Sequence, residues 1–316
     1  MTHSQRLGRN KNLRTVFFGM GGATSALVLG ALLAAGVDVR GVVLAAGRFA
    51  RATRPEPIVA LPPPLLALRA PGEPSAAQLA HDHGIALLEL RHAGEPATLQ
   101  AIAALRPDIA CVACFPLRLP APLLAIPPLG FLNMHPSLLP RHRGPAPLFW
   151  AFRAGEHETG VTIHRMDENF DTGPIALQSP VALPDGIGGD AAERACSRLG
   201  AELMVAALRS LGGGTLALQP QPPGGGYEPW PASGSWWIEA GWPARRAFNF
   251  MRGAESWGRL YRLRVAGRDL ALAGALSFAP DAVLGAPLRE QGETVQIQMS
   301  PGVLCARLAW SRAQSD

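Results

Sequence analysis

The sequence predicts an α/β fold in which a larger domain, built on a parallel sheet, precedes a small β-rich domain. Two observations carry this prediction. Strand-like and helix-like apolar runs alternate as far as residue 211, which is typical of β-α-β units. After a stretch dense in glycine and proline, at 212–234, only short alternating runs follow, and these indicate strands.

The composition agrees with two folded domains joined by a linker at 212–234. The chain has 316 residues, of which 48% are hydrophobic and 17% charged, so it can bury a sizeable core. Lys11 is the only lysine, and arginine carries nearly all the positive charge. The net charge of +5 is mild for this length, so basicity alone does not identify a nucleic-acid partner.

The N-terminal part is expected to open the sheet after a flexible tail, residues 1–12. An apolar span at 16–37 follows basic residues and superficially resembles a signal peptide or a membrane helix, but five glycines interrupt it. It divides better into a strand at 15–20, a glycine turn, a helix at 26–36 and a second strand at 37–46. We therefore expect a cytoplasmic protein without a membrane segment.

Further elements alternate along the chain. The first turn lacks a dinucleotide-binding G-x-G-x-x-G, because Thr24 occupies the position of its last glycine. Dense prolines at 48–74 predict a long loop, and Ser75 is placed to cap the next helix. The remaining elements are expected as helices at 75–80, 95–105, 148–154 and 189–211, and as strands at 85–90, 109–115, 160–166 and 174–183.

Four cysteines are too few for a disulfide framework in a chain of this length. Cys111 and Cys114 form a C-x-x-C pair, but they lie in an apolar run that is expected to be a strand. Positions three apart in a strand point to opposite faces. We therefore interpret both as small core residues, and we expect no metal site.

Candidate chemistry gathers where the apolar run at 131–135 ends. Asn133 and His135 are two residues apart, so on a strand their side chains share one face and can point into one pocket. Asp171 follows downstream, between Asn169 and Gly173, in a turn-forming context. An amide, an imidazole and a carboxylate that converge on one point are suited to acyl transfer to an amine.

Each of these side chains has a physical role in such a transfer. The amide of Asn133 can donate to the oxygen that becomes negative when an amine attacks a formyl carbon. The imidazole of His135 can assist that oxygen or move a proton near neutral pH. The carboxylate of Asp171 can orient and stabilise the imidazole or help to deprotonate the attacking ammonium. An amine nucleophile needs no serine or cysteine, and the chain has no G-x-S-x-G motif.

At these residues the chain resembles the folate-dependent formyltransferases. Their motif N-x-H-x-S-L-L-P-x-x-x-G-x-x-P is present from Asn133 to Pro147. It continues as E-T-G-V-T-I from Glu158 to Ile163, and as M-D-x-x-x-D-T-G from Met166 to Gly173. Agreement at so many fixed positions is not expected by chance.

The resemblance implies a Rossmann-like catalytic domain at 13–211, with 10-formyltetrahydrofolate as formyl donor and co-substrate. It implies that Asn133, His135 and Asp171 are the catalytic residues. It also implies contacts with the donor and, less specifically, with the acceptor. The donor contacts are Cys114, Phe115, Pro116, Leu117, Asp167, Glu168, Asn169 and Phe170, and the acceptor contacts are Ser137, Leu138, Leu139, Pro140 and Arg252.

Beyond the linker the resemblance is weaker, and it implies an open β-barrel of OB-like type at 235–316. Trp257 and Tyr261 keep the family outline, whereas Ser256 replaces a proline and Trp230 replaces a lysine. A run of arginines in this domain could follow phosphates, or it could be solvated surface that reflects the composition. These arginines are Arg245, Arg246, Arg252, Arg259, Arg262, Arg264 and Arg268.

The acceptor amine stays open at this point. Methionyl-tRNA is our first candidate, because of the C-terminal domain and its arginines. An amino-sugar nucleotide or another small amine is an alternative, because the loop at 48–74 has no lysine cluster. A hydrolase of 10-formyltetrahydrofolate and an inactive folate-binding protein are two further alternatives. The sequence leaves the oligomeric state open, and also whether the proline-rich loop contacts the acceptor.

Overall fold

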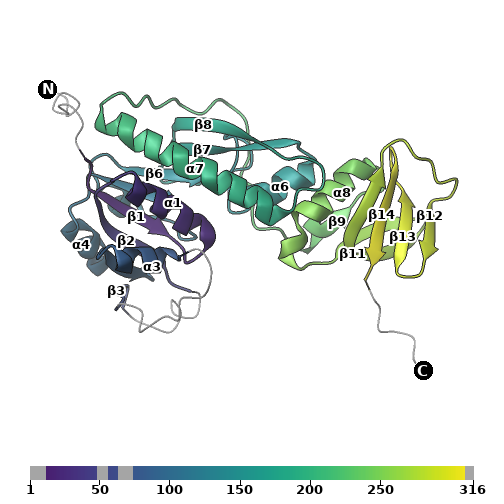
Figure 1. The fold of residues 1–316 in the computed structure, drawn as a ribbon, viewed down its shortest axis with the longest axis horizontal. Coiled ribbons are helices and arrows are strands. Elements are labelled where there is room, and N and C mark those ends of the chain that lie inside the picture. Colours follow the sequence, from purple (N-terminus) through teal and green to yellow (C-terminus); the bar gives the residue numbers. More distant parts are fainter. Residues whose placement is uncertain (1–11, 48–55, 63–73, 310–316) are drawn as a thin grey trace. The chain divides into compact units, whose positions relative to one another are not determined.

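The computed structural model describes residues 12–47, 56–62 and 74–309. The chain divides into two compact units, whose elements are labelled in Figure 1. Two segments of the second unit lie inside the range 13–211, which was predicted to be one domain. The predicted domain limits therefore stay a prediction. The first unit comprises Met1–Arg143, Gly160–Pro180 and Ala195–Gly226, and the second comprises Gly144–Thr159, Val181–Arg194 and Tyr227–Asp316.

An eight-stranded sheet with the order β3-β4-β2-β1-β5-β6-β7-β8 organises the first unit. The strands from β4 to β6 in this order pair in parallel, whereas β3 pairs antiparallel with β4 and β7 pairs antiparallel with β6. The predicted Rossmann-like α/β fold is confirmed, with a mixed sheet. The strands are β1 (Thr15–Gly19), β2 (Val39–Ala45), β3 (Ile58–Ala60), β4 (Ala86–Leu90), β5 (Ile109–Ala113), β6 (Phe131–His135), β7 (Glu158–Arg165) and β8 (Ile175–Ala182).

Five of the described helices lie close to their predicted positions, whereas those at Ala121–Leu124 and Ala244–Gly253 were not predicted. Ser75 caps α3 by accepting a hydrogen bond of 3.2 Å from the backbone nitrogen of Gln78. Apolar side chains of α4 and α5, including Ile102 and Leu123, pack with Phe18 and Phe131 of the sheet in one buried cluster. The helices are α1 (Ala23–Ala34), α3 (Ala76–Asp82), α4 (Pro96–Ala104), α5 (Ala121–Leu124), α6 (Pro147–Ala154), α7 (Gly189–Gly212) and α8 (Ala244–Gly253).

The order of the parallel strands places β1 between β2 and β5. In open α/β sheets, ligands bind beyond the carboxyl ends of the strands near such a change of direction. β5 is shorter than the predicted strand at 109–115 because Cys114 has φ 58°, in the left-handed region, where a strand cannot continue. This break carries the chain out of the sheet directly at its carboxyl edge.

The proline-rich segment at 48–74 is described only in part. Its residues 56–62 contain β3, a three-residue strand at the edge of the sheet, where prolines are tolerated beside a strand. The rest of this segment, and nearly all of the predicted tail 1–12, lie outside the described residues. Among the helices in the described part of the chain, none is long and apolar enough to cross a membrane.

The second unit contains a six-stranded sheet with the order β12-β13-β14-β11-β10-β9, which confirms the predicted β-rich domain. Phe149 and Phe152 of α6 pack with Trp236, Phe250 and other buried side chains in its core. Burial of these large aromatic side chains stabilises this core. The strands are β9 (Trp237–Ile238), β10 (Tyr261–Val265), β11 (Arg268–Ala279), β12 (Leu288–Gln291), β13 (Thr294–Gln298) and β14 (Val303–Leu308).

Candidate active site

Asn133 and His135 lie near the carboxyl end of β6, in the first unit. In the antiparallel pair with β7, Asn133 is opposite His164 and His135 is opposite Thr162. On its other side β6 pairs in parallel with β5, where Asn133 is opposite Val112. Because residues i and i+2 of a strand share a face, the two polar side chains project from the same side of the sheet.

The carboxylate of Asp171 lies at these two side chains. Asp171 Oδ1 is 3.5 Å from Asn133 Nδ2 and 3.6 Å from His135 Nδ1. The side chains of His135 and Asp171 are only 5% and 13% exposed, so their interaction is weakly screened by water. The structure thus brings together the three residues singled out in the sequence, while their catalytic roles stay a prediction.

The hydrogen bonds of His135 identify the nitrogen that titrates. Its Nε2 lies 2.9 Å from the backbone oxygen of His142, and a carbonyl only accepts hydrogen bonds, so Nε2 carries a proton. The other nitrogen, Nδ1, faces Asp171. Burial lowers the pKa of His135 below its ordinary value of 6.5, and the negative charge of Asp171 only partly opposes this. His135 is therefore neutral at pH 7, with Nδ1 ready to accept a proton.

The loop that carries Asp171 is held from several sides. Asp171 has φ 55°, an unusual conformation for a residue with a side chain. Asp167 accepts hydrogen bonds of 3.0 Å from the Asn169 backbone nitrogen and 2.8 Å from the Thr172 hydroxyl. Gly173 has no room for a Cβ atom, which would collide with the backbone oxygen of Arg165. These contacts place the carboxylate against β6.

Two residues that support this loop were not predicted from the sequence. Gln221 donates hydrogen bonds of 2.8 Å to the backbone oxygens of both Asp171 and Gly173. The guanidinium of Arg143 in turn donates to Gln221 Oε1, at 2.7 Å from Nη2. Gln221 lies in the segment 212–234, which was interpreted only as a linker, and no motif marks it.

The third missed residue is His164 on β7. His164 Nε2 is 3.1 Å from Asn133 Nδ2 and 3.5 Å from Asp171 Oδ1. An amide nitrogen donates, so Nε2 accepts from Asn133, while Nδ1, 3.2 Å from the backbone oxygen of Arg165, carries the proton. The alternating run 160–166 predicted a strand that includes His164, but only the strand pairing shows that His164 lies opposite Asn133.

The two segments predicted to contact the formyl donor lie together. Arg118, directly after the segment Cys114–Leu117, donates a hydrogen bond of 3.0 Å to the backbone oxygen of Glu168 in the second segment. Cys114, Pro116, Glu168 and Asn169 are exposed, and the ring of Phe170 is 51% exposed. Apolar surface and backbone groups are therefore available for a flat polar ring. Their contact with the donor stays a prediction.

The residues predicted to contact the acceptor have other partners in this structure. Ser137 is buried and donates to the backbone oxygen of Arg141 at 2.6 Å. Leu139 is buried as well, and Leu138 and Pro140 are half-buried. These four side chains shape the turn after β6. Arg252 belongs to the second unit, where it pairs with Glu255 at 2.6 Å. Acceptor binding by all five residues stays a prediction.

The cysteine pair occupies two different environments. Cys111 is buried in β5, as predicted, whereas Cys114 follows the end of β5 and is exposed. The interpretation of Cys114 as a core residue was therefore wrong, because the strand ends before it. Burial raises the pKa of the Cys111 thiol well above its ordinary value. No cluster of three or more potential metal ligands occurs within the described residues.

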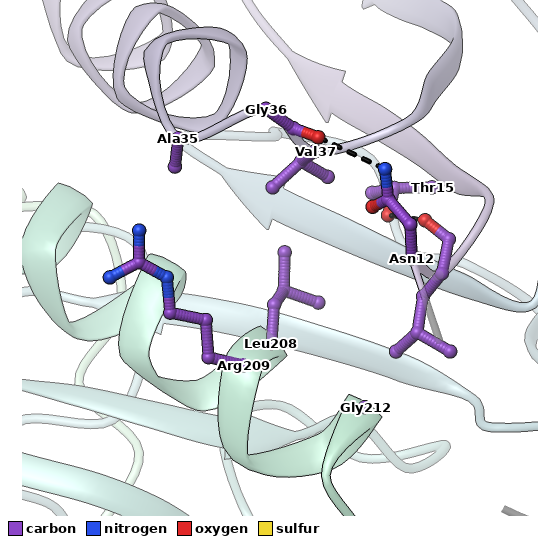
Figure 2. A pocket seen from close by; sticks show the side chains of 9 residues that line it. Asn12, Thr15, Ala35, Gly36, Val37, Leu208, Arg209 and Gly212 are labelled. Carbon is purple, nitrogen blue, oxygen red and sulfur yellow. Dashed lines mark hydrogen bonds between the residues drawn. The ribbon is translucent and has the colours of Figure 1, made fainter. Parts of the chain in front are cut away.

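A separate cavity of about 270 Å³ lies near the amino ends of the parallel strands (Figure 2). It is bounded by Thr15, where β1 begins, by residues 35–37 after α1, and by Leu208 and Arg209 of α7. The amino ends of parallel strands lie at the opposite end of the sheet from their carboxyl ends. This cavity therefore does not belong to the site at the end of β6.

Comparison with known proteins decides the family. The family described as "Formyl transferase" matches residues 47–208 of the chain. The chain belongs to the formyl transferase family. The matched residues include β6 and the Asp171 loop, while the catalytic roles of the individual residues stay a prediction.

Curated relatives support this assignment. The methionyl-tRNA formyltransferase of Anaeromyxobacter dehalogenans is 36% identical over 232 residues, which cover 70% of each chain. That of Chloroflexus aggregans is 40% identical over 197 residues, or 61% of this chain and 58% of the relative. Most alignments of this kind span about half of the relative, as for Parvibaculum lavamentivorans, with 47%. Among solved structures, the sugar 3N-formyl transferase WlaRD shares the fold, with a TM-score of 0.63 at 13% identity over 94% of this chain and 98% of WlaRD.

Proposed function

We propose that this formyl transferase moves a formyl group from 10-formyltetrahydrofolate to the α-amino group of methionyl-tRNA in the cytoplasm. The observation that carries the transfer is the convergence of Asn133 and His135 on Asp171 Oδ1, at 3.5 and 3.6 Å. Both distances are long for hydrogen bonds. A polar atom of a substrate can therefore replace one of them without the loss of a strong contact.

The folate donor supplies a formyl carbon whose oxygen gains negative charge when an amine attacks. Asn133 has two N–H groups, of which one is committed to His164 at 3.1 Å. The other, now 3.5 Å from Asp171, is free to donate to this oxygen. In other enzymes a donor of this kind contributes about 100-fold to 1,000-fold in rate.

His135 and Asp171 handle the proton of the attacking amine. His135 Nδ1 accepts it, and Asp171 stabilises the imidazolium that forms, because its carboxylate lies 3.6 Å away. His135 then returns the proton to the nitrogen that leaves with the folate. A C–N bond forms between the formyl carbon and the amine, and the C–N bond to the folate breaks. One N–H bond of the amine is lost and one N–H bond of tetrahydrofolate is formed, so the step balances without a metal or a redox partner.

The acceptor rests on the relatives that are named methionyl-tRNA formyltransferase and on the presence of the β-rich second unit. The decisive experiment incubates the full chain with 10-formyltetrahydrofolate in three arms: methionyl-tRNA, a nucleoside-diphosphate amino sugar, and no acceptor. Tetrahydrofolate is followed by absorbance, and the formylated product by mass spectrometry. Asp171→Asn serves as the matched inactive control.

Product in the methionyl-tRNA arm alone is the expected result. Product only with the amino sugar would reject methionyl-tRNA as the acceptor and retain formyl transfer as the reaction. Tetrahydrofolate without any acceptor would indicate a hydrolase. Folate binding without turnover in all three arms would reject the transfer itself.

A further inference from the structure

The arginine run of the second unit is not a continuous basic surface. Four of its seven members form ion pairs with carboxylates. Their charges are largely compensated, and such exposed pairs contribute little to binding another anion. The pairs are Arg245 with Asp185 at 2.7 Å, Arg252 with Glu255 at 2.6 Å, Arg264 with Asp269, and Arg268 with Glu290 at 2.8 Å.

Arg246 of this run behaves differently, because it meets a second arginine, Arg153 of α6. The guanidinium of Arg246 lies 3.8 Å from the ring centre of Trp242, and that of Arg153 lies 5.0 Å from the same centre. Both arginines are half-buried and Trp242 is buried. Gly155, which follows α6, leaves the space that the Arg246 side chain occupies, since a Cβ there would lie 2.8 Å from Arg246 Cγ.

Neither guanidinium has a carboxylate within ion-pair distance among the described residues. Burial lowers the pKa of both groups, and for Arg153 the nearby charge of Arg246 lowers it further. Glu239, an exposed residue, raises both values through space but forms no ion pair with either. The attraction of Glu239 exceeds the repulsion of Arg153 by Arg246, but it acts at a distance, and neither guanidinium has a carboxylate of the described residues as a direct ion-pair partner.

Many of their donors also lack a protein acceptor in the described part of the chain. A guanidinium has five N–H groups. Arg246 uses two of them, both toward the backbone oxygen of Arg153. Arg153 uses one, toward the backbone oxygen of Trp237. The bonds of Arg246 cap the C-terminal end of α6, a structural role that accounts for one arginine but not for the second.

We propose that Arg153 and Arg246 form a phosphate-binding site, whose natural occupant is a backbone phosphate of the tRNA acceptor. Two guanidinium groups beside one aromatic ring offer several donors within reach of one anion, and such multiple donation favours arginine over lysine at phosphate sites. A phosphate supplies the direct ion pair that no carboxylate of the described residues gives to either guanidinium. The choice of tRNA rests on the proposed function, while a nucleoside diphosphate carries the same chemistry and is the alternative source.

The test measures binding separately from catalysis. Arg153→Gln and Arg246→Gln are compared with Arg245→Gln, which removes a neighbouring arginine of α8 that is already paired with Asp185. Fluorescence anisotropy of labelled initiator tRNA is recorded between about 50 and 200 mM salt. Calorimetry with thymidine diphosphate and with inorganic phosphate forms the other two arms. Circular dichroism and thermal melts verify that each variant folds.

Each glutamine variant at the site is expected to weaken tRNA binding about 5-fold to 10-fold and to reduce the slope of log affinity against log salt by about 1. Arg246→Lys should recover only part of the affinity, because it keeps the charge and loses the planar fork. Arg245→Gln should leave both quantities unchanged. In formylation assays, KM for methionyl-tRNA should rise while kcat stays constant.

Unchanged affinity and slope in folded Arg153→Gln and Arg246→Gln would overturn the proposal. An equal loss in Arg245→Gln would do the same, because the effect would then be general charge. Loss of affinity for thymidine diphosphate alone would reject tRNA as the source. If wild-type protein binds tRNA at this site but does not formylate methionyl-tRNA, the proposed function fails and the phosphate site stands.

Discussion

The side-chain amide of Gln221 donates a hydrogen bond of 2.8 Å to the backbone oxygen of Asp171. A second bond of the same length reaches Gly173. Asp171 has φ 55°, and non-glycine residues in this region are held there by their surroundings at a cost of about 1–3 kcal/mol. Gln221 therefore helps to hold the loop in this conformation.

Gln221→Ala should lower kcat for formyl transfer about 10-fold, because a misplaced Asp171 no longer faces His135. Affinity for the folate donor should change little. The measurement is steady-state kinetics with saturating donor. Gln219→Ala is the matched control, since Gln219 bonds to Ile175 only through its backbone atoms. Equal kinetics for the Gln221 variant and wild type would show that the loop is held without the amide.

Asn133→Ala should lower kcat/KM by about 100-fold or more, since it removes the donor to the formyl oxygen. The neighbouring side chains stay in place, so thermal stability should fall by only about 1–2 kcal/mol, the scale for a lost partly buried hydrogen bond. Single-turnover kinetics separates this loss from product release. A variant that keeps the wild-type single-turnover rate would remove Asn133 from the mechanism.

Asp171→Asn keeps the shape of the side chain and removes its charge. We expect turnover to fall by about 100-fold or more, because His135 then accepts a proton without a carboxylate to stabilise it. The pKa of His135 should fall further, since Asp171 is the charge that raises it. Titration of the imidazole by NMR measures this shift. A pKa of His135 that rises in the variant would contradict the geometry of the site.

Folding stability should depend on pH through His135. Its pKa in the folded protein lies below the ordinary 6.5, so between these two values the unfolded chain binds a proton that the folded chain does not. The free energy of unfolding therefore decreases as pH falls below about 6.5, and above this pH His135 contributes no further change. Urea unfolding between about pH 5 and 8 measures the effect. His135→Gln should show a flatter profile, and an unchanged profile would assign the dependence to other groups.

Local patterns predicted much of the fold and half of the site. The glycine-interrupted span at 16–37 was correctly divided into strand, turn and helix, and α3 begins at Ser75 as its capping side chain indicates. Asn133 and His135 share a face because the side-chain period of a strand is two. Asp171 was placed with them by a motif, since no spacing rule joins a loop to a strand so far away in the chain.

The residues that escaped prediction depend on tertiary pairing. His164 becomes part of the site only because β7 runs antiparallel to β6 in one particular register, and a single sequence does not reveal this register. Gln221 escaped because a segment rich in glycine and proline predicts loop structure but not what the loop contacts. The early end of β5 depends on the left-handed backbone of Cys114, which few non-glycine residues adopt.

The position of Gln221 also decides how small a working fragment can be. A fragment that ends with α7, at Gly212, keeps every residue of the recognised motif and loses the amide that holds the Asp171 loop. Extension to Gly226, the last residue of the first unit, restores that amide. A chain rearranged by recombination would therefore keep the amide that supports the Asp171 loop only if the crossover fell after Gln221.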